Sequence, residues 1–174
     1  MKLYTTTLLF LLLFIAFQAG AQKVFMKVTG SKTGVIKDQT VSKYPDKIEL
    51  TGYSFDASTP VDMATVARSP KRTHSPLIIN KVNNQSSVLL FAAQAKGEIL
   101  TKVVIEVYKI NNMGMEILDQ TIELSNATIT FFRQNFDNNP APGANKGPND
   151  EIRLAYQKIT YTYANGGAVA EDSW

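Results

Sequence analysis

The sequence has no cysteine and a single histidine, His74, among its 174 residues. Without cysteine the chain can form no disulfide and has no thiol nucleophile, and a zinc site would lack most of its usual ligands. A Ser–His–acid triad would have to use His74, which we interpret as a solvated loop histidine because it lies among prolines and other turn-forming residues. The sequence therefore predicts a protein that is not an enzyme and that has no catalytic residue, no metal and no cofactor.

Net charge and long apolar runs are also scarce. The formal net charge is +3, and because Lys2 carries one of the positive charges, the chain after residue 21 carries only +2. This gives little long-range attraction for phosphate backbones, so we expect no nucleic-acid partner. The one long apolar run, at residues 8–17, follows Lys2 and precedes Ala-Gly-Ala at 19–21, which is typical of a cleaved secretory signal peptide. We expect residues 1–21 to be removed, leaving residues 22–174 as a single domain, periplasmic or secreted, without a membrane segment.

Most of the remaining sequence has the alternation of polar and apolar residues that is typical of β-strands. Alternation occurs over residues 23–28, 46–55 and 98–110, and the last of these is followed by a turn at 111–115 and a returning strand, which predicts a hairpin. Near the end of the chain, the large residues change phase between Tyr156 and Ile159. Because side chains in a strand alternate between two faces, we expect a β-bulge near Gln157 or Lys158.

One segment has helical periodicity. Four apolar residues follow the spacing i, i+3, i+4, i+7 and predict the buried stripe of a helix over residues 87–96: Val88, Phe91, Ala92 and Ala95. Ser86 or Ser87 is expected to cap the helix, and Gly97 to end it. Strands outnumber helices and no βαβ alternation is present. The sequence therefore predicts a mainly β fold, a compact antiparallel β-barrel of two packed sheets with one short flanking α-helix.

Two loops and the tail interrupt the strand pattern. Residues 56–76 hold three prolines and many small residues, so we expect a long excursion that forms a contact surface. Its candidate contact residues are Asp56, Asp62, Arg68, Lys71, Arg72 and His74. Residues 137–150 are rich in Pro, Gly and Asn and are expected to stay outside any strand ladder, with a calcium site as the alternative to a turn-forming role. Residues 166–174 have little reason to be ordered.

Six segments, taken in order, resemble the haemolysin-coregulated protein (Hcp) family of type VI secretion. They are "VFMKVTGSKTG", "IELTGYSFDAS", "SPLIINKVNNQSSVLLFAAQAKGEI", "VVIEVYK", "ELSNATITFF" and "DEIRLAYQKITYTY". The last is the most specific, because Glu151 opens a strand that ends in Ile159, Tyr161 and Tyr163. The resemblance implies a β-barrel that assembles as homohexameric rings. It also implies that the rings stack into a secretion tube, that the lumen carries small protein cargo, and that residues 56–76 contact the adjoining subunit or ring.

The predicted signal peptide departs from this family, whose tube proteins assemble in the cytoplasm and leave through the secretion machine. Two hypotheses follow. The first is an exported structural protein that assembles into hexameric rings and stacked tubes. The alternative is an exported, non-enzymatic binding module that keeps the barrel but has lost the tube function. We expect that deletion of residues 56–76 abolishes stacking while the barrel still folds, and that EDTA and His74→Ala change neither stability nor assembly.

Overall fold

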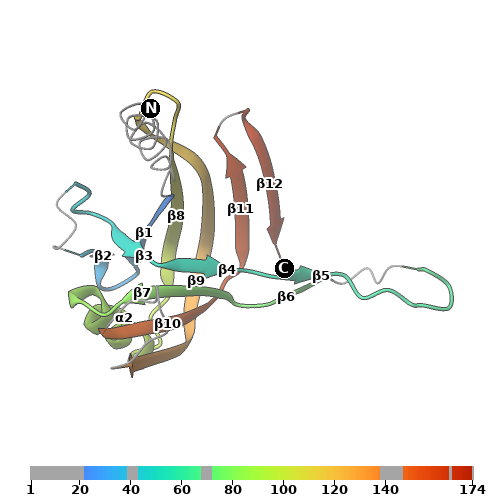
Figure 1. Cartoon of the computed structure of the whole chain (residues 1–174). Helices are drawn as coiled ribbons and strands as arrows, with labels where there is room; N and C mark the ends of the chain where they lie inside the picture. The colour runs from blue at the N-terminus through green and yellow to red at the C-terminus, as the bar shows by residue number, and fades with distance from the viewer. Residues whose placement is uncertain (1–21, 39–42, 68–71, 138–146, 165, 174) are drawn as a thin grey trace, which may run out of the picture.

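The computed structural model describes residues 22–38, 43–67, 72–137, 147–164 and 166–173 (Figure 1). Strands dominate this part of the chain, and one helix, α2 (Gln85–Ala95), accompanies them. The strands are β1 (Lys23–Gly30), β2 (Gly34–Ile36), β3 (Ile48–Leu50), β4 (Gly52–Ser54), β5 (Ala57–Ser58), β6 (Thr73–His74), β7 (Leu77–Val82), β8 (Leu100–Ile110), β9 (Glu116–Asp137), β10 (Gly147–Ala155), β11 (Lys158–Tyr163) and β12 (Ala168–Ser173). The mainly β class predicted from the sequence is confirmed.

The long strand β9 belongs to two antiparallel sheets. Its first part pairs with β8 on one side and β11 on the other, and its last part pairs with β10. A straight strand of 22 residues would span roughly 70 Å, so one small sheet cannot accommodate it. Asn126, which lies between the two parts, has a φ of 50°, a left-handed conformation that asparagine tolerates better than most residues. The chain therefore passes from the first sheet to the second at this residue.

The predicted barrel is open. Seven of the described strands are paired in the order β2-β1-β8-β9-β10-β7-β4, with β3, β11 and β12 paired off this path, and no hydrogen-bonded pair among the described strands joins β4 back to β2. The two sheets instead bury their apolar faces against one another. Met26, Ile79, Ile105, Leu124 and Ile152, taken from alternate strand positions in both sheets, are inaccessible to solvent. This interdigitated apolar layer is the main source of stability, since the chain has no disulfide.

The predicted strand at residues 46–55 is two strands. Ile48–Leu50 forms β3 and pairs with β1 in the first sheet, whereas Gly52–Ser54 forms β4 and pairs with β7 in the second. The phase change near the end of the chain has the same cause. β10 ends at Ala155 in the second sheet and β11 begins at Lys158 in the first. The predicted β-bulge at Gln157 or Lys158 is therefore wrong, because the chain breaks and moves between sheets there.

The expected buried face of the helix is wrong. Val88 and Phe91 are exposed by 69% and 54%, and the buried residues of α2 are Ser86, Ser87, Leu90 and Ala93. The cap also differs, because the side chain of Asn84 accepts the hydrogen bond from Ser86 N, although Gly97 follows the helix with a φ of +58° as expected. Apolar periodicity does not predict buried serines, since the burial of Ser87 depends on a polar partner that is distant in the sequence.

Two segments expected to be irregular are strands. Residues 147–150 pair with the end of β9, with Pro148 opposite Phe136 and Asp150 opposite Gln134, so the prediction that they join no ladder is wrong. The tail forms β12, which pairs with β11 along its whole length. Its order comes from backbone hydrogen bonds at a sheet edge, which need no apolar pattern. Residues 138–146 and Trp174 lie outside the described residues.

Candidate assembly surfaces

The excursion predicted at residues 56–76 leaves the body of the molecule as a narrow projection, which we call the arm (Figure 1). Its base is an antiparallel ribbon of β5 and β6, in which Ala57 lies opposite His74 and Ser58 opposite Thr73. The ribbon is continued toward the body by a hydrogen bond of 3.0 Å from Ser75 N to the carbonyl oxygen of Asp56. The arm is therefore an ordered two-stranded element at its base.

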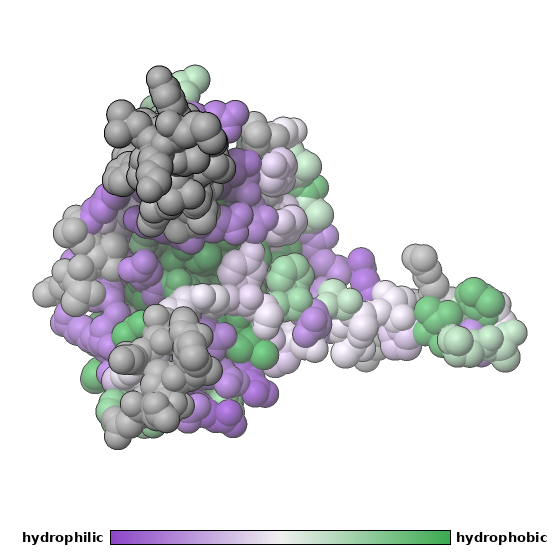
Figure 2. All heavy atoms as spheres, in the orientation of Figure 1, coloured by the Kyte–Doolittle hydropathy of each residue, from purple (hydrophilic) through white to green (hydrophobic). Residues whose placement is uncertain are grey.

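The tip of the arm, residues 61–67, is a tight turn with apolar side chains on its outside. Asp62 shapes the turn: its N–H donates to the carbonyl of Ala67 at 2.9 Å, and its Oδ1 accepts from Ala64 N at 2.8 Å. The hydrogen bond from Ala64, with further help from Thr65, lowers the pKa of the Asp62 carboxyl group. Met63 and Val66 are exposed by 89% and 78%, and the end of the arm is visibly apolar (Figure 2).

Val66 adds backbone strain to this exposure. Its φ is 54°, a left-handed conformation that is a clear outlier for a β-branched residue. Strain of this kind persists only where the surrounding structure determines it, and it is concentrated at contact and functional sites. The apolar tip therefore has two properties of a recognition element: exposed apolar side chains and a conformation that its own residues disfavour.

The arm is fixed at its base by the C-terminal strand. Arg72 Nη2 lies 2.8 Å from Asp172 Oδ1, and His74 Nε2 lies 2.9 Å from Asp172 Oδ2. The side chain of His74 is only 5% exposed, and its ring meets that of Tyr156 edge-on at 6.3 Å. The interpretation of His74 as a solvated loop histidine is therefore wrong, and so is the basis for expecting His74→Ala to leave stability and assembly unchanged. The fold buries it because β12, which the sequence did not predict, covers it.

The candidate contact residues do not converge on one site. Asp56 lies in the base of the arm, Asp62 at the tip, and Arg72 and His74 at the contact with β12. Arg68 and Lys71 lie outside the described residues. The arm thus has a base, with polar contacts to the body, and an apolar tip. Sequence reasoning selected the charged residues of this segment and missed Val61, Met63 and Val66, although their apolar character in a polar loop was a usable signal.

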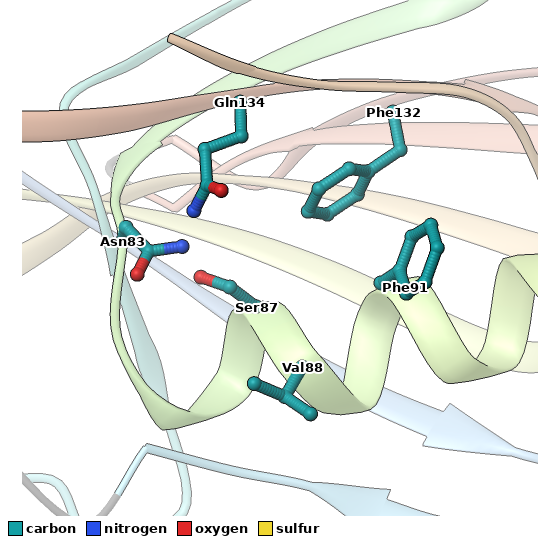
Figure 3. A pocket seen from close by; sticks show the side chains of 6 residues that line it. All are labelled: Asn83, Ser87, Val88, Phe91, Phe132 and Gln134. Carbon is teal, nitrogen blue, oxygen red and sulfur yellow. The ribbon is translucent and has the colours of Figure 1, made fainter. Parts of the chain in front are cut away.

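A second apolar surface lies on the exposed face of α2 (Figure 3). A cavity of about 340 Å³ is lined by Asn83, Ser87, Val88, Phe91, Phe132 and Gln134. Phe91 of the helix and Phe132 of β9 meet edge to face with ring centroids 5.5 Å apart. We call this the helix pocket. In Figure 1, α2 and the tip lie on opposite sides of the body, so the tip of a chain cannot reach its own helix pocket.

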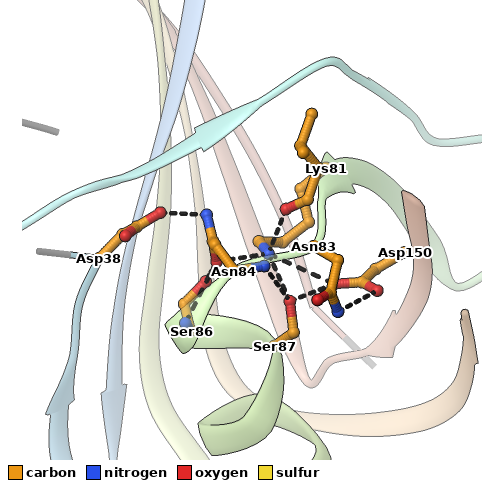
Figure 4. A network of polar contacts seen from close by, with 8 residues as sticks. Asp38, Lys81, Asn83, Asn84, Ser86, Ser87 and Asp150 are labelled. Atoms are coloured by element: carbon orange, nitrogen blue, oxygen red, sulfur yellow. Dashed lines mark hydrogen bonds and ion pairs between the residues drawn. The ribbon is translucent and has the colours of Figure 1, made fainter. Parts of the chain in front are cut away.

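A buried polar network holds the wall of the helix pocket (Figure 4). Lys81 Nζ is fully enclosed and donates to Ser87 Oγ at 2.7 Å and to Asn84 Oδ1 at 2.8 Å. It also lies 3.3 Å from Asp150 Oδ2. Burial lowers the pKa of Lys81, and the charge of Asp150 partly offsets this effect. The network joins β7, β10 and the start of α2, and Asn84 Nδ2 extends it to Asp38.

Metal binding and membrane insertion are the two other classes of function on which the described residues bear. Within the described ranges, no group of three or more His, Asp or Glu side chains is placed to hold a metal ion. The same residues include no helix that is both long and apolar enough to cross a membrane. The calcium alternative on residues 137–150 concerns a loop that lies mostly outside the described residues, so the insensitivity to EDTA stays a prediction.

The open two-sheet fold, the arm and the exposed apolar surfaces define a mainly β protein built to contact other proteins. The model of the family described as "Type VI secretion system effector, Hcp" matches residues 25–163. The "Major exported protein" of Pseudomonas aeruginosa is 30% identical over 165 residues, which cover 88% of this chain and 96% of that protein. The chain therefore belongs to the Hcp family of the type VI secretion system.

Solved structures agree with this assignment at the level of the fold. A "Crystal structure of Hcp protein" has a TM-score of 0.81 at 24% identity and covers 88% of this chain and 98% of its own. "Secreted protein Hcp3 from Pseudomonas aeruginosa" has a TM-score of 0.70 at 26% identity, with 88% and 99% covered. The family resemblance identified in the sequence, and with it the class of exported structural protein of the tube-subunit kind, is confirmed.

Proposed function

We propose that this chain is a ring-forming tube subunit whose copies contact one another through the tip of the arm and through the face of α2 that carries the helix pocket. The observation that carries the proposal is the apolar tip, which is exposed at the end of a projecting and anchored ribbon. Burial of apolar surface between copies would supply the driving force for assembly.

The geometry of ring assembly supports two different contact surfaces. A closed ring of more than two identical subunits forms when one surface of each subunit contacts a different surface of the next. The tip and the helix pocket are such a pair, because both are apolar and they lie on opposite sides of the molecule. The Hcp family forms homohexameric rings, so the partner for these surfaces is another copy of this chain.

The role is structural, with no reaction catalysed and no cofactor bound. His74 is committed to Asp172 at the base of the arm, and Lys81 and Asp150 are enclosed in the interior, where no substrate reaches them. We further propose a mature chain of residues 22–174, exported after cleavage of residues 1–21, with no nucleic-acid or membrane partner. Small proteins are the proposed cargo of the ring lumen.

The proposal is tested by removing the apolar character of the tip without removing the arm. In the variant Val61→Ser, Met63→Ser, Val66→Ser we expect rings and stacks to be lost in negative-stain images, while the far-UV circular dichroism spectrum and the unfolding midpoint stay unchanged. The matched control is Met113→Ser, since Met113 is 82% exposed in the hairpin turn between β8 and β9. Assembly by the triple variant at the wild-type concentration would overturn the proposal.

A further inference from the structure

The C-terminal strand β12 lies outside the part of the chain that the family model matches. The match ends at residue 163, and β12 begins at Ala168. In the structure this strand is paired along its whole length with β11, and it ends beside the base of the arm (Figure 1). Its contact with the arm is made by Asp172.

The arm needs such a contact to keep one direction. Its ladder contains only two residue pairs, Ala57 with His74 and Ser58 with Thr73. A two-stranded ribbon is marginally stable by itself in water, and one this short has no core of its own. Without a further contact the ribbon would pivot about its connection to the body, and the apolar tip would sample many directions.

Asp172 supplies the contact with both of its carboxylate oxygens. Oδ1 forms an ion pair with Arg72 Nη2 at 2.8 Å, and Oδ2 lies 2.9 Å from His74 Nε2. The two interactions contribute differently to the stability of the contact. The Arg72 side chain is 60% exposed, and ion pairs in solvent contribute little, whereas the His74 and Asp172 side chains are 5% and 19% exposed. Hydrogen bonds to a carboxylate shielded from water are among the stronger ones in proteins.

The ring of Tyr156 gives this contact a rigid support. Tyr156 is 4% exposed and belongs to the hydrophobic core, at the point where the chain passes from the second sheet to the first. Its ring packs edge-on against that of His74. Asp172 therefore holds His74 from the side of β12 while the core holds it through Tyr156.

We propose that β12 is a positioning element that sets the direction in which the arm leaves the body, and that Asp172 is its positioning residue. The strand preorganises the arm. Because the tip already points in one direction before contact, binding does not carry the entropy cost of ordering the arm. The consequence for assembly rests on the proposed function, whereas the positioning itself does not.

The test measures the direction of the arm directly. Because the chain has no native cysteine, Ala64→Cys at the tip and Ala95→Cys at the end of α2 place two spin labels without background. Double electron–electron resonance then reports their distance distribution, with labelled chains diluted into unlabelled ones so that distances within a chain dominate. We expect a narrow distribution for the wild type and one broadened at least about twofold for Asp172→Ala, as local order is lost.

The matched control is Glu171→Gln. Glu171 is the neighbour of Asp172 on β12 and forms an ion pair with Lys158 at 2.8 Å, away from the arm. The Glu171→Gln substitution should leave the spin-label distance distribution as narrow as in the wild type. If Asp172→Ala does not fold, as judged by circular dichroism, Asp172→Asn retains the size of the side chain and replaces it. A wild-type distribution for a folded Asp172 variant would overturn the proposal.

Assembly is scored separately. If the arm acts as proposed, Asp172→Ala should require about tenfold more protein to form rings, equivalent to 1.4 kcal/mol. A broadened distribution with unchanged assembly would contradict the role of the arm in the proposed function and leave the positioning role intact. Weakened assembly with an unchanged distribution would contradict the positioning role instead.

Discussion

At the scale of single residues, the most demanding feature is a lysine in the interior. Lys81 has no accessible surface, and neither does the side chain of Asp150 beside it. Taking two charges out of water costs several kcal/mol for each, so the pair persists only because hydrogen bonds from several elements satisfy it. Ser87 Oγ and Asn83 Nδ2 also donate hydrogen bonds to the Asp150 carboxylate. The network consequently specifies how α2 docks.

We therefore expect Lys81→Ala to reduce the free energy of unfolding by about 3–5 kcal/mol, because Asp150 would be left buried without its counter-charge. The measurement is urea unfolding of residues 22–174 at pH 7. Lys102→Ala is the control, since its ion pair with Glu123 is exposed on both sides and should contribute less than about 1 kcal/mol. Equal effects of the two substitutions would contradict the account, whereas recovery of stability in Lys81→Met, Asp150→Leu would support it.

Glu98 gives the fold a dependence on pH. Its carboxylate accepts hydrogen bonds from Thr33 Oγ1 at 2.6 Å and from the N–H groups of Thr33 and Lys32 at 2.7 Å. These bonds, with that from the Thr33 hydroxyl foremost, lower the pKa of Glu98. The carboxylate packs so closely on Gly30 that a Cβ there would lie 2.4 Å from Oε1. Glu98 thereby ties the start of β8 to the turn between β1 and β2.

Because the folded state binds this proton less readily than the unfolded state, the stability contributed by Glu98 is present above its ordinary pKa, about 4.3, and is lost as pH falls through the lowered value. Glu98→Gln should be less stable than the wild type at pH 7 and should lose less stability between pH 5 and pH 3. The check is the urea midpoint at several pH values, with the exposed Glu123→Gln as control. A parallel pH dependence in Glu98→Gln and the wild type would contradict this role.

Residue chemistry of this kind is only partly readable from the sequence. The low charge and the lack of cysteine follow from composition. Lys81 contacts Asn84, Ser87 and Asp150, and Asn84 in turn contacts Asp38. Such a set is assembled only by the fold. The burial of His74 was not predicted for the same reason. The strand that covers it, β12, has no apolar alternation from which a strand could be predicted.

At the scale of elements, α2 depends on its first turn. Asn84 caps the helix by accepting from Ser86 N, and the Ser87 hydroxyl accepts from Asn84 N in return, which closes a capping box. The exposed face of the helix is apolar at Val88 and Phe91, so its position is not explained by amphipathic burial alone. Polar contacts at the N-terminus help to determine which face is presented.

We expect Asn84→Ala to destabilise the protein by about 1–2 kcal/mol through loss of the cap, and to increase hydrogen exchange at the first turn of α2 more than elsewhere. Gln85→Ala is the control, because Gln85 occupies the adjacent, exposed position and supplies no cap. Hydrogen exchange with mass spectrometry on peptides covering residues 84–96 makes the measurement. Exchange that rises evenly across the chain would show that the effect is not local to the helix.

Strand and helix prediction failed where one stretch of sequence serves two sheets. Alternation found β1 and the β8–β9 hairpin, since each has an apolar face on one core. It could not show that β3 and β4 pair in different sheets, or that β10 and β11 do, because periodicity describes a face and not a partner. The helix was located correctly, but an uninterrupted apolar run such as Val88 to Phe91 does not specify which side is buried.

At the scale of the whole molecule, the chain is a two-sheet body with an arm that projects from one side. The body buries its apolar layer without help from other chains, so it can fold as a unit. The arm does not bury its tip. This difference is the physical reason to expect assembly: besides the apolar face of α2, an apolar surface is left exposed after folding at the end of an element that points away from its own body (Figure 1, Figure 2).

The overall class and the arm were predictable from the sequence, because a long polar excursion stands out between strand patterns. The open barrel was not predictable. Its closure depends on whether β4 and β2 form hydrogen bonds with each other, and the sequence of neither strand shows its pairing partner. The apolar tip was present in the sequence at residues 61–66 and was overlooked in favour of charged neighbours.

The most direct test of the account is the mass of a chain of residues 22–174 by size-exclusion chromatography with light scattering, followed by negative-stain imaging of the same fractions. We predict a species of six chains that appears in images as closed rings. A single-chain mass over a wide range of concentrations would contradict the account and favour a binding module that keeps the fold without assembling.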